Sequence, residues 1–288
     1  MKNAELPIHP RSIREIAEEA VAQALPPKTP FPRLNSYVRG WRQHNEYVIA
    51  GREQRPVSDL MLTLGQHFAE SNGRVIWIAD YASLKESCDR MLFRLAGIPI
   101  GPSRTVTILS DELAFLNDHL VALQNLPMDL LNIDECGDIA VEDKFFAEAS
   151  SDQPTLIVVD SCVLEDASQD ALTVLARRVH LQRMLDRLKT TNKDWRILWN
   201  LPMNSTLATD WESPAIIDDI AEPEIAKRAA VIIVPHIQCS ATDACEAKLV
   251  IAKNSEKTGT IDVRYVPEFS SWADDRSNDR PSPSGRVE

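Results

Sequence analysis

The sequence predicts an α/β fold in which a mostly parallel sheet is covered by helices on both faces. Two observations indicate it. Short, continuous apolar runs alternate with helical stretches along most of the chain, and such runs are typical of parallel strands buried on both faces. Two later runs, Lys248–Ala252 and Thr260–Tyr265, flank a polar turn that ends in Gly259, which predicts a C-terminal β-hairpin.

The strand candidates of the main sheet are mostly apolar and short. They are Tyr47–Ala50, Val75–Ala79, Thr105–Leu109, Leu130–Ile133, Leu156–Asp160, Ile197–Trp199 and Val231–Val234. Helices are expected between them, notably at Ser83–Leu95, Ser110–Leu123 and Ala171–Lys189. Ser110 is a suitable N-cap residue, and acidic residues follow it in the first turn, where the helix dipole favours negative charge.

The length and composition indicate one large domain with appendages. The chain has 288 residues, of which 44% are hydrophobic, so a substantial core is expected. We expect an N-terminal linker helix and Pro-rich connector over residues 1–32, the main domain over 33–272 and a disordered tail over 273–288, which is rich in Asp, Ser, Pro and Arg. The formal charge of -12 argues against a generally basic nucleic-acid-binding surface, although a local basic patch stays open.

Nothing in the sequence indicates a membrane or secretory protein. No apolar run is long enough to span a bilayer, and the N-terminus lacks the features of a signal peptide. The five cysteines include no CxxC pair, which predicts reduced, mostly buried thiols. We therefore expect a cytoplasmic protein with no membrane partner.

The N-terminal helix is predicted by a capping box. Ser12 and Glu15 have the S-x-x-E spacing, and apolar residues follow at helical intervals as far as Leu25. The segment Pro26–Pro32 then reads as a stiff extended connector that holds the helix away from the main body. The apolar stripe of such a helix must be buried, either on a neighbouring subunit or back on its own chain.

The stretch after the first strand has the layout of a phosphate-binding loop. Gly51 opens a predicted seven-residue loop that ends near Ser58, and a helix follows. In the working pattern GxxxxGK[ST], backbone N–H groups cradle the phosphates, the Lys neutralises them and the Ser or Thr hydroxyl holds magnesium. Gly51 and Ser58 fit the two ends, but Pro56 and Val57 occupy the positions of the second Gly and the Lys.

These replacements predict that ordinary ATP binding is lost. Pro56 has no N–H to donate and removes the conformational freedom of a glycine. Val57 puts an apolar, branched side chain where a cation would meet the phosphates. Arg52 and Arg55 offer positive charge nearby, but the motif spacing does not give either of them the geometry of the Lys.

A second element of nucleotide chemistry lies about a hundred residues downstream. The run Leu156–Asp160 is a hydrophobic strand that ends in a carboxylate, which is how a Walker-B Asp is presented to magnesium. Alone the signal is weak, because many buried strands end in Asp. Together with Gly51 and Ser58 it is moderate, and it makes Ser58 and Asp160 the residues expected to hold magnesium if the ion binds.

Taken in order, these segments resemble a known family. They are TPFPRLNSYVRGWRQHNEYVIAGR before the loop, VIWIADYASLKESCDRMLFRLAGI, LSDELAFLNDHLVALQNLPMDL, the TLIVVD strand, RILWNLPMN and IAKNSEKTGTIDVRYVPEFSSW. Over roughly residues 12–269 the chain resembles the C-terminal RecA-like domain of replicative DnaB-type (superfamily 4) DNA helicases, preceded by their linker helix. The resemblance implies a RecA-like P-loop NTPase fold, with the last segment as its C-terminal hairpin.

The departures from the family fall on its chemistry. Tyr81 stands at the position of the catalytic Glu, and Asp80 is one residue off. The family's hairpin carries a Lys, retained here as Lys253, and an arginine finger, which is replaced by Ser255. Asn200 stands where the family has a sensor Gln. Because the finger alone is worth about 10³-fold or more in rate, no confident catalytic residue is left. The residues of the vestigial nucleotide site are Gly51, Arg52, Arg55, Ser58, Asp160 and Lys253.

We therefore expect a catalytically silent DnaB-like protein that acts in DNA replication by assembling with itself or with a replicative helicase, as a regulator, loader or inhibitor. No cofactor is expected in that case. One alternative is a divergent but active ATP-dependent helicase, which would need ATP and magnesium and would use Arg52 or Arg55 in place of the Lys. The other is a DNA-binding module without ATPase activity, which would use Lys253, Lys257 and Arg264.

Overall fold

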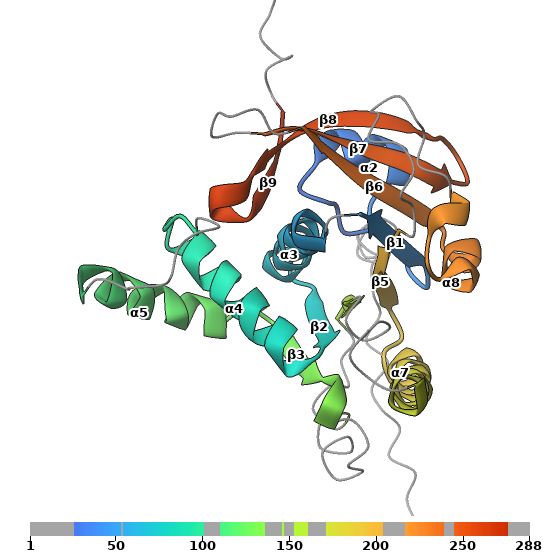
Figure 1. Ribbon diagram of the computed structural model, residues 1–288, viewed down its shortest axis with the longest axis horizontal. Coiled ribbons are helices and arrows are strands. Elements are labelled where there is room, and N and C mark those ends of the chain that lie inside the picture. The colour runs from blue at the N-terminus through green and yellow to red at the C-terminus, as the bar shows by residue number, and fades with distance from the viewer. Residues whose placement is uncertain are drawn as a thin grey trace, which may run out of the picture.

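The computed structural model describes residues 26–52, 54–100, 110–135, 146, 153–160, 171–203, 217–238 and 245–275. Within them one sheet organises the chain, with strand order β3-β2-β4-β5-β1-β6-β7-β8-β9 (Figure 1). The strands are β1 (Glu46–Gly51), β2 (Arg74–Ala79), β3 (Met128–Asn132), β4 (Thr155–Val159), β5 (Trp195–Pro202), β6 (Val231–Gln238), β7 (Cys245–Asn254), β8 (Gly259–Val266) and β9 (Ser271–Asp274).

The predicted α/β class and mostly parallel sheet are confirmed. All neighbouring strands from β3 to β6 in the sheet order pair in parallel, and the predicted hairpin is the antiparallel pair β7–β8, which β6 and β9 flank. The helices are α2 (Pro32–Val38), α3 (Gln54–Glu70), α4 (Tyr81–Leu95), α5 (Ser110–Gln124), α7 (Ala171–Thr191) and α8 (Pro223–Arg228). Short 3₁₀ turns are η1 (Ile133–Glu135), η3 (Ile217–Asp219) and η4 (Pro267–Phe269). The predicted strand Thr105–Leu109 lies outside the described residues.

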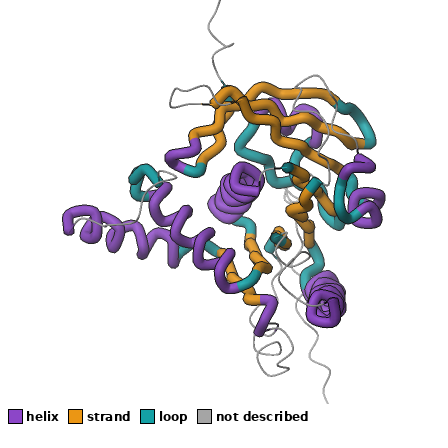
Figure 2. The backbone as a smooth tube through the Cα atoms, viewed as in Figure 1, coloured by secondary structure: helices purple, strands orange, loops and turns teal. Residues whose placement is uncertain are grey.

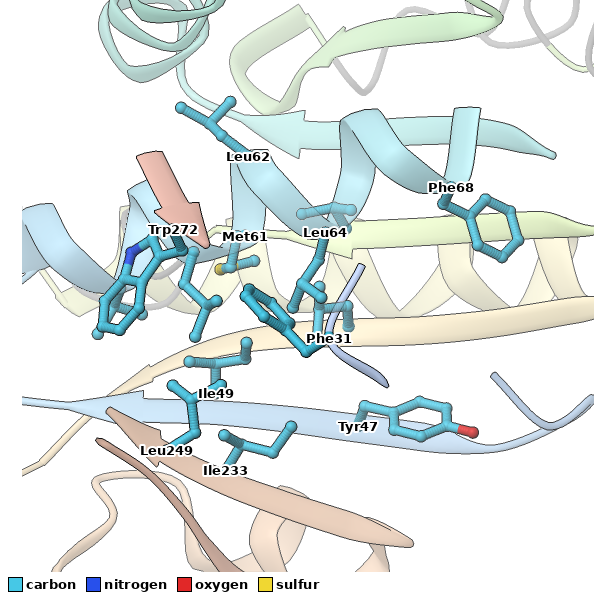
Figure 3. Close-up of a cluster of buried hydrophobic side chains, with 14 of the residues drawn as sticks. Phe31, Tyr47, Ile49, Met61, Leu62, Leu64, Phe68, Ile233, Leu249 and Trp272 are labelled. Carbon is cyan, nitrogen blue, oxygen red and sulfur yellow. The ribbon is translucent and has the colours of Figure 1, made fainter. Parts of the chain in front are cut away.

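Helices lie on both faces of the sheet (Figure 2), and each face has its own apolar core. Alternate residues of β1 point to opposite faces, so Tyr47 and Ile49 join the core under α2 and α3, and Val48 and Ala50 join the core under α7 and α8. Figure 3 shows the first core, where Ile49 meets Met61 and Leu64 of α3 beside Phe31 and Trp272. The continuous apolar strands of the sequence are explained by this burial on both sides.

The Pro-rich connector does not stand away from the body, which corrects the expectation. Phe31 is fully buried in the core under α3. The Trp41 backbone N–H donates to the Pro27 carbonyl at 2.8 Å, and the Thr29 N–H donates to the Asn35 side chain at 2.8 Å. A single large apolar side chain among the prolines is enough to fix the segment, because burying a Phe contributes about 1.5–3 kcal/mol. The predicted helix from Ser12 to Leu25 lies outside the described residues.

Two further expectations need correction at the C-terminal side of the sheet. Strand β9 includes Ala273 and Asp274, so the folded domain extends past residue 272, and the rest of the predicted tail, from residue 276, lies outside the described residues. Cys245, at the start of β7, is disulfide-bonded rather than a thiol; spacing along the sequence does not show which sulfur atoms come within bonding reach. Cys88 is a free thiol, and burial raises its pKa. In the part of the chain that the structure describes, no helix combines the length and apolarity needed to cross a bilayer.

Candidate functional site at the end of β1

The segment after β1 is helical where the sequence predicts an open loop. Helix α3 begins at Gln54, only three residues after Gly51. Pro56 therefore lies in the first turn of the helix, a position that tolerates proline because the first N–H groups have no partner in the helix. Ser58 lies half-buried in the second turn instead of at the end of a loop. Residues 54 to 57 run along the helix axis and do not arch around a space of phosphate size.

The start of α3 is also fixed from its sides. Val57 is 1% exposed and belongs to the apolar core of the sheet. The Pro56 carbonyl accepts a hydrogen bond from Trp272 Nε1 at 3.1 Å. Asp59 is fully buried, and its two carboxylate oxygens accept from the Tyr265 hydroxyl at 2.7 Å and from Arg90 Nη1 at 3.2 Å. Each residue from 56 to 59 except Ser58 is thus held by apolar packing or by a hydrogen bond.

Sequence reasoning missed this set of contacts. A signal was present for Asp59, because a carboxylate inside an otherwise apolar helix is rarely buried without a partner. Nothing in the sequence identified Tyr265 and Arg90 as those partners, since they lie 206 and 31 residues away.

A polar pair does persist at the ends of the neighbouring strands. Asp160 follows β4, and Asn200 lies in β5, the strand between β4 and β1. Asn200 Nδ2 donates to Asp160 Oδ1 at 3.0 Å, and both side chains are buried. Asn200 Oδ1 has no hydrogen-bond partner among the described residues. Both residues share the sheet face of α3, because Val158 and Leu198 two residues before them belong to the core of that face.

The predicted basic substitutes do not join this pair. Arg52 is exposed and lies close enough to His236 of β6 for its charge to act on the ring: burial, and then the charge of Arg52, lower the pKa of His236. His236 alternates in phase with Val234 of the opposite core, so its side chain belongs to the other face of the sheet from Asn200. The side chain of Arg55 lies outside the described residues.

Asp80 and Tyr81, which lie next to and at the predicted catalytic-Glu position, are at the start of α4. Asp80 is the N-cap of α4, and its side chain accepts from the Ser83 N–H at 2.7 Å, an arrangement that satisfies one of the free N–H groups of the helix. Tyr81 is the first residue of α4 and is 67% exposed. Neither side chain is a base directed at a reacting water.

The hairpin is tied to its own chain. Lys253 Nζ donates to the carbonyls of Ala226 and Lys227 at 2.9 and 2.5 Å, where it caps the C-terminal end of α8, and burial lowers its pKa. Ser255 is exposed in the turn that follows. The next residue, Glu256, pairs with Arg39 at 2.7 Å and also with Arg42.

These contacts bind the tip of the hairpin to the end of α2 and to the segment that follows it. Asn254 Nδ2 adds a hydrogen bond to the Tyr37 carbonyl at 2.8 Å, and the Lys257 ammonium lies 4.6 Å from the centre of the Tyr37 ring. The charged groups of the tip therefore point to partners in the same chain.

The residues present do not fit a magnesium triphosphate. The loop that would surround it is helical, the position of its Lys is a buried Val57, and in the described part of the chain no three His, Cys, Asp or Glu side chains are close enough to hold a metal ion. Ser58 and Asp160 are the only pair that the motif spacing offers, and Ser58 is in the second turn of a helix.

Solved structures share this architecture. A structure described as "ATPase Domain of G40P" is similar at a TM-score of 0.65 and 13% identity, over 92% of this chain and 99% of that one. The chain has the RecA-like fold of DnaB-like helicase ATPase domains. A second structure, "The Structure Of A DnaB-Like Replicative Helicase And Its Interactions With Primase", agrees at a TM-score of 0.64 and 14% identity, over 93% of this chain and 68% of that one.

The RecA-like, DnaB-type fold that the sequence motifs predicted is thereby confirmed. No protein-family model and no curated protein matches the sequence. At 13–14% identity a shared fold does not carry the relative's activity with it. What this domain does has to be argued from its own residues.

Proposed function

We propose that the chain is a DnaB-like protein that does not hydrolyse ATP and that acts in DNA replication by assembling with itself or with a replicative helicase. The observation that carries the proposal is the start of α3 at Gln54, with Pro56 and Val57 inside the helix. A phosphate loop needs a chain path that leaves several N–H groups directed at one anion. That path is replaced by a packed helical turn, while the described strands form one nine-stranded sheet with a RecA-like fold.

The hairpin supports the same proposal. In a ring of active subunits, a positive group of the hairpin would reach the neighbour's nucleotide and stabilise charge in the transition state. Here Ser255 carries no charge, and Lys253 and Glu256 are engaged with α8 and with the residues after α2. The hairpin is arranged as a structural part of its own subunit.

The preserved features favour a role through contacts. Each face of the sheet has an extensive apolar core among the described residues, and the likeness to a solved ATPase domain covers 92% of the chain. We infer that a protein with this scaffold and without the phosphate loop acts through contacts with other proteins. Cytoplasmic location follows from this role as part of the proposal.

The direct test measures nucleotide binding and ATP turnover with magnesium, with and without single-stranded DNA. We expect no turnover and no saturable binding at millimolar ATP. Co-purification of the tagged chain with the replicative helicase of its host, or self-association in sedimentation, is the expected positive result. Magnesium-dependent hydrolysis that disappears in Asp160→Ala would overturn the proposal and would establish the alternative of an active helicase.

One observation supports the alternative of an active helicase. It is the hydrogen bond between the buried side chains of Asp160 and Asn200 under α3. If Arg52 served as the missing cation, Arg52→Ala would abolish turnover and strand separation. The control is Arg33→Ala, a partly buried arginine of α2, which leaves any activity unchanged. Loss of activity in both variants would show that the effect is one of general charge.

The DNA-binding alternative is tested separately, by measuring DNA affinity between 50 and 200 mM salt. Lys253 is held by two carbonyl groups, whereas Lys257 and Arg264 are both exposed. A binding site of a few phosphate contacts loses affinity steeply over this range. Binding with that slope, lost in Lys257→Ala and Arg264→Ala together, would support a DNA-binding module; binding without salt dependence would exclude it.

A further inference from the structure

The C-terminal strand lies against the start of α3. Figure 1 shows β9 beside α3, although most of the chain separates them. Trp272 of β9 is 4% exposed and donates its Nε1–H to the Pro56 carbonyl. Tyr265 of β8 pairs with Trp272 in the sheet, and their rings are 4.9 Å apart. Since the Tyr265 hydroxyl binds Asp59, two neighbouring aromatic side chains hold the first two turns of α3.

The contact to Pro56 depends on the helical path of the chain. In a helix the carbonyl groups point along the axis toward the C-terminal end, and the Pro56 carbonyl has a second lone pair free for Trp272. An arched phosphate loop would redirect that peptide group and break the contact. The Trp272 N–H would then be buried without a partner, which is costly.

The contact to Asp59 fixes the rotation of the same helix. Asp59 is fully buried, so its charge is tolerated only with hydrogen-bonding partners. Tyr265 supplies one of them from β8, and Arg90 supplies another from α4. Any turn of α3 about its axis would withdraw the carboxylate from both.

The strand that makes these contacts is short and lies at the edge of the sheet. Outside the strand, Arg94 Nη1 donates to the Ser270 carbonyl at 3.4 Å and the Ile100 N–H donates to the Glu268 carbonyl. Among the described strands, β9 has four residues, pairs with β8 alone and is the last in the sheet order. It is joined to η4 by Ser270, whose φ of 46° and ψ of 42° lie in the left-handed region that residues other than glycine disfavour. The Ser270 hydroxyl is buried and has no hydrogen-bond partner among the described residues. Short edge elements of this kind open at low free energy.

We propose that the segment Pro267–Asp274 is a latch, which holds the first turn of α3 in its helical form and opens as a unit from the edge of the sheet. The latch controls the shape of the chain after β1, and it operates whether or not the protein assembles with a helicase. It goes beyond the proposed function because it makes the closed site a conformational state of the molecule, maintained by a separate segment.

Hydrogen exchange of the full-length chain, read by mass spectrometry, tests the latch. Trp272→Phe keeps an aromatic ring in the core and deletes only the N–H that binds Pro56. We expect exchange of the amides in residues 54–61 to rise about tenfold, as for loss of one hydrogen bond to a buried group. Exchange in β1 and β5 is expected to stay unchanged.

The matched control is Trp77→Phe. Trp77 is buried in the same core, and its Nε1 has no hydrogen-bond partner among the described residues. This variant therefore makes the same change in side-chain size without removing a hydrogen bond, and the Trp77 ring packs near Gly65, farther along α3 than residues 54–61. A rise in residues 54–61 that is confined to Trp272→Phe supports the latch. Equal rises in both variants, a uniform rise over the sheet, or no rise would overturn it.

Two further variants keep the test independent of any one substitution. Tyr265→Phe removes the hydroxyl that binds Asp59 and is expected to raise exchange in the same residues. Ser270→Gly relieves the left-handed backbone and is expected to lower it, because glycine adopts that conformation without a steric cost. Opposite signs for these two variants are a result that simple loss of stability would not produce, and equal signs would count against the latch.

Discussion

The carboxyl ends of neighbouring parallel strands differ sharply in this molecule. At the ends of β4 and β5 the buried polar pair Asp160–Asn200 remains, with a hydrogen bond between the two side chains. At the end of β1, two strands from β4, the chain turns at once into α3 and buries Val57 in the apolar core. Ligand sites of open parallel sheets are built at these carboxyl ends from several strands together. Apolar core side chains can therefore occupy the carboxyl end of one strand while the ends of neighbouring strands keep their polar groups.

The physical reason for the difference is the surroundings of each position. Asp160 and Asn200 satisfy one another, so they can stay buried without a ligand. The phosphate loop has no such internal partner, because its N–H groups converge on an anion that must be supplied. With Pro56 and Val57 in place of the loop residues, α3 begins as early as Gln54, and its first turn packs against Trp272.

Val57→Lys is expected to have the largest effect. The side chain is 1% exposed among apolar residues, and placing an unpaired ammonium group there costs at least about 3 kcal/mol of unfolding free energy. In an open phosphate loop the same Lys would be solvated and harmless. Urea denaturation measures the change, with Val57→Met as the control, for which we expect a loss under about 1.5 kcal/mol. A Lys variant as stable as the Met variant would mean that the end of β1 is open.

Asp160→Ala is expected to come next. It leaves the Asn200 amide buried without its acceptor, and an unsatisfied buried donor costs about 1–3 kcal/mol. Asn200→Ala and the double variant complete a cycle, for which we expect a coupling energy of about 1 kcal/mol, again from urea denaturation. A coupling near zero would show that the two side chains act independently, and the contrast with the end of β1 would lose its basis.

Much of the fold follows from the sequence, because burial on both faces leaves a direct mark on it. Continuous apolar runs such as Val75–Ala79 and Leu156–Asp160 predicted strands that the structure has within one or two residues. The edge strand β9 was missed because four residues with one buried Trp272 carry no periodicity. The connector was misjudged because Pro-rich composition outweighed the one residue, Phe31, that anchors it.

The site was harder to predict than the fold. Motif spacing predicted that phosphate-binding groups are missing at certain positions, and it implied that a loop would persist there, whereas the structure has a helix. Whether Pro56 interrupts a loop or starts a helix depends on contacts made by Trp272 and Tyr265, more than 200 residues away in the chain. Such long-range contacts have no local signal. The proximity of Arg52 to His236 likewise follows from the pairing of β1 with β6.

A smaller effect on the free energy of unfolding is expected at the opposite end of β1, where Glu46 lies. Glu46 accepts from Arg228 at 2.7 Å, Lys189 at 3.2 Å and Trp199 Nε1 at 3.0 Å. Burial alone raises the pKa of Glu46, but the hydrogen bond and charge of Arg228, together with Lys189, outweigh it and hold the pKa below its ordinary value of 4.5. A carboxyl with a lowered pKa stabilises the fold above the unfolded pKa, and this contribution is lost as the pH falls through the folded pKa.

Glu46→Gln is therefore expected to cost about 1 kcal/mol at pH 7, since Arg228 and Lys189 are partly exposed. The difference from the natural chain should be constant above pH 5 and shrink as the pH falls below 4.5. Unfolding free energies measured by urea between pH 3 and 7 test this. A difference that does not change with pH would mean that the Gln variant acts through packing alone.

The smallest expected effect is that of Arg52→Ala on the pKa of His236. This pKa can distinguish a closed end of β1 from one in which Arg52 binds phosphates. Burial is the main cause of the lowered pKa of His236, and the charge of Arg52 adds to it. Arg52→Ala is therefore expected to raise that pKa toward 6.5 without reaching it, because the burial remains. Titration of the His236 ring by NMR measures the shift, with Arg33→Ala as the control that leaves it unchanged.

The same titration in the presence of magnesium and ATP turns this effect into a test of the comparison. If Arg52 bound the phosphates, their negative charge would offset the guanidinium and raise the pKa of His236 at least as far as Arg52→Ala does. If the end of β1 is closed, nucleotide leaves the titration curve where it is. We expect the second result, because the chain that would bring the phosphates to Arg52 is already committed to the first turn of α3.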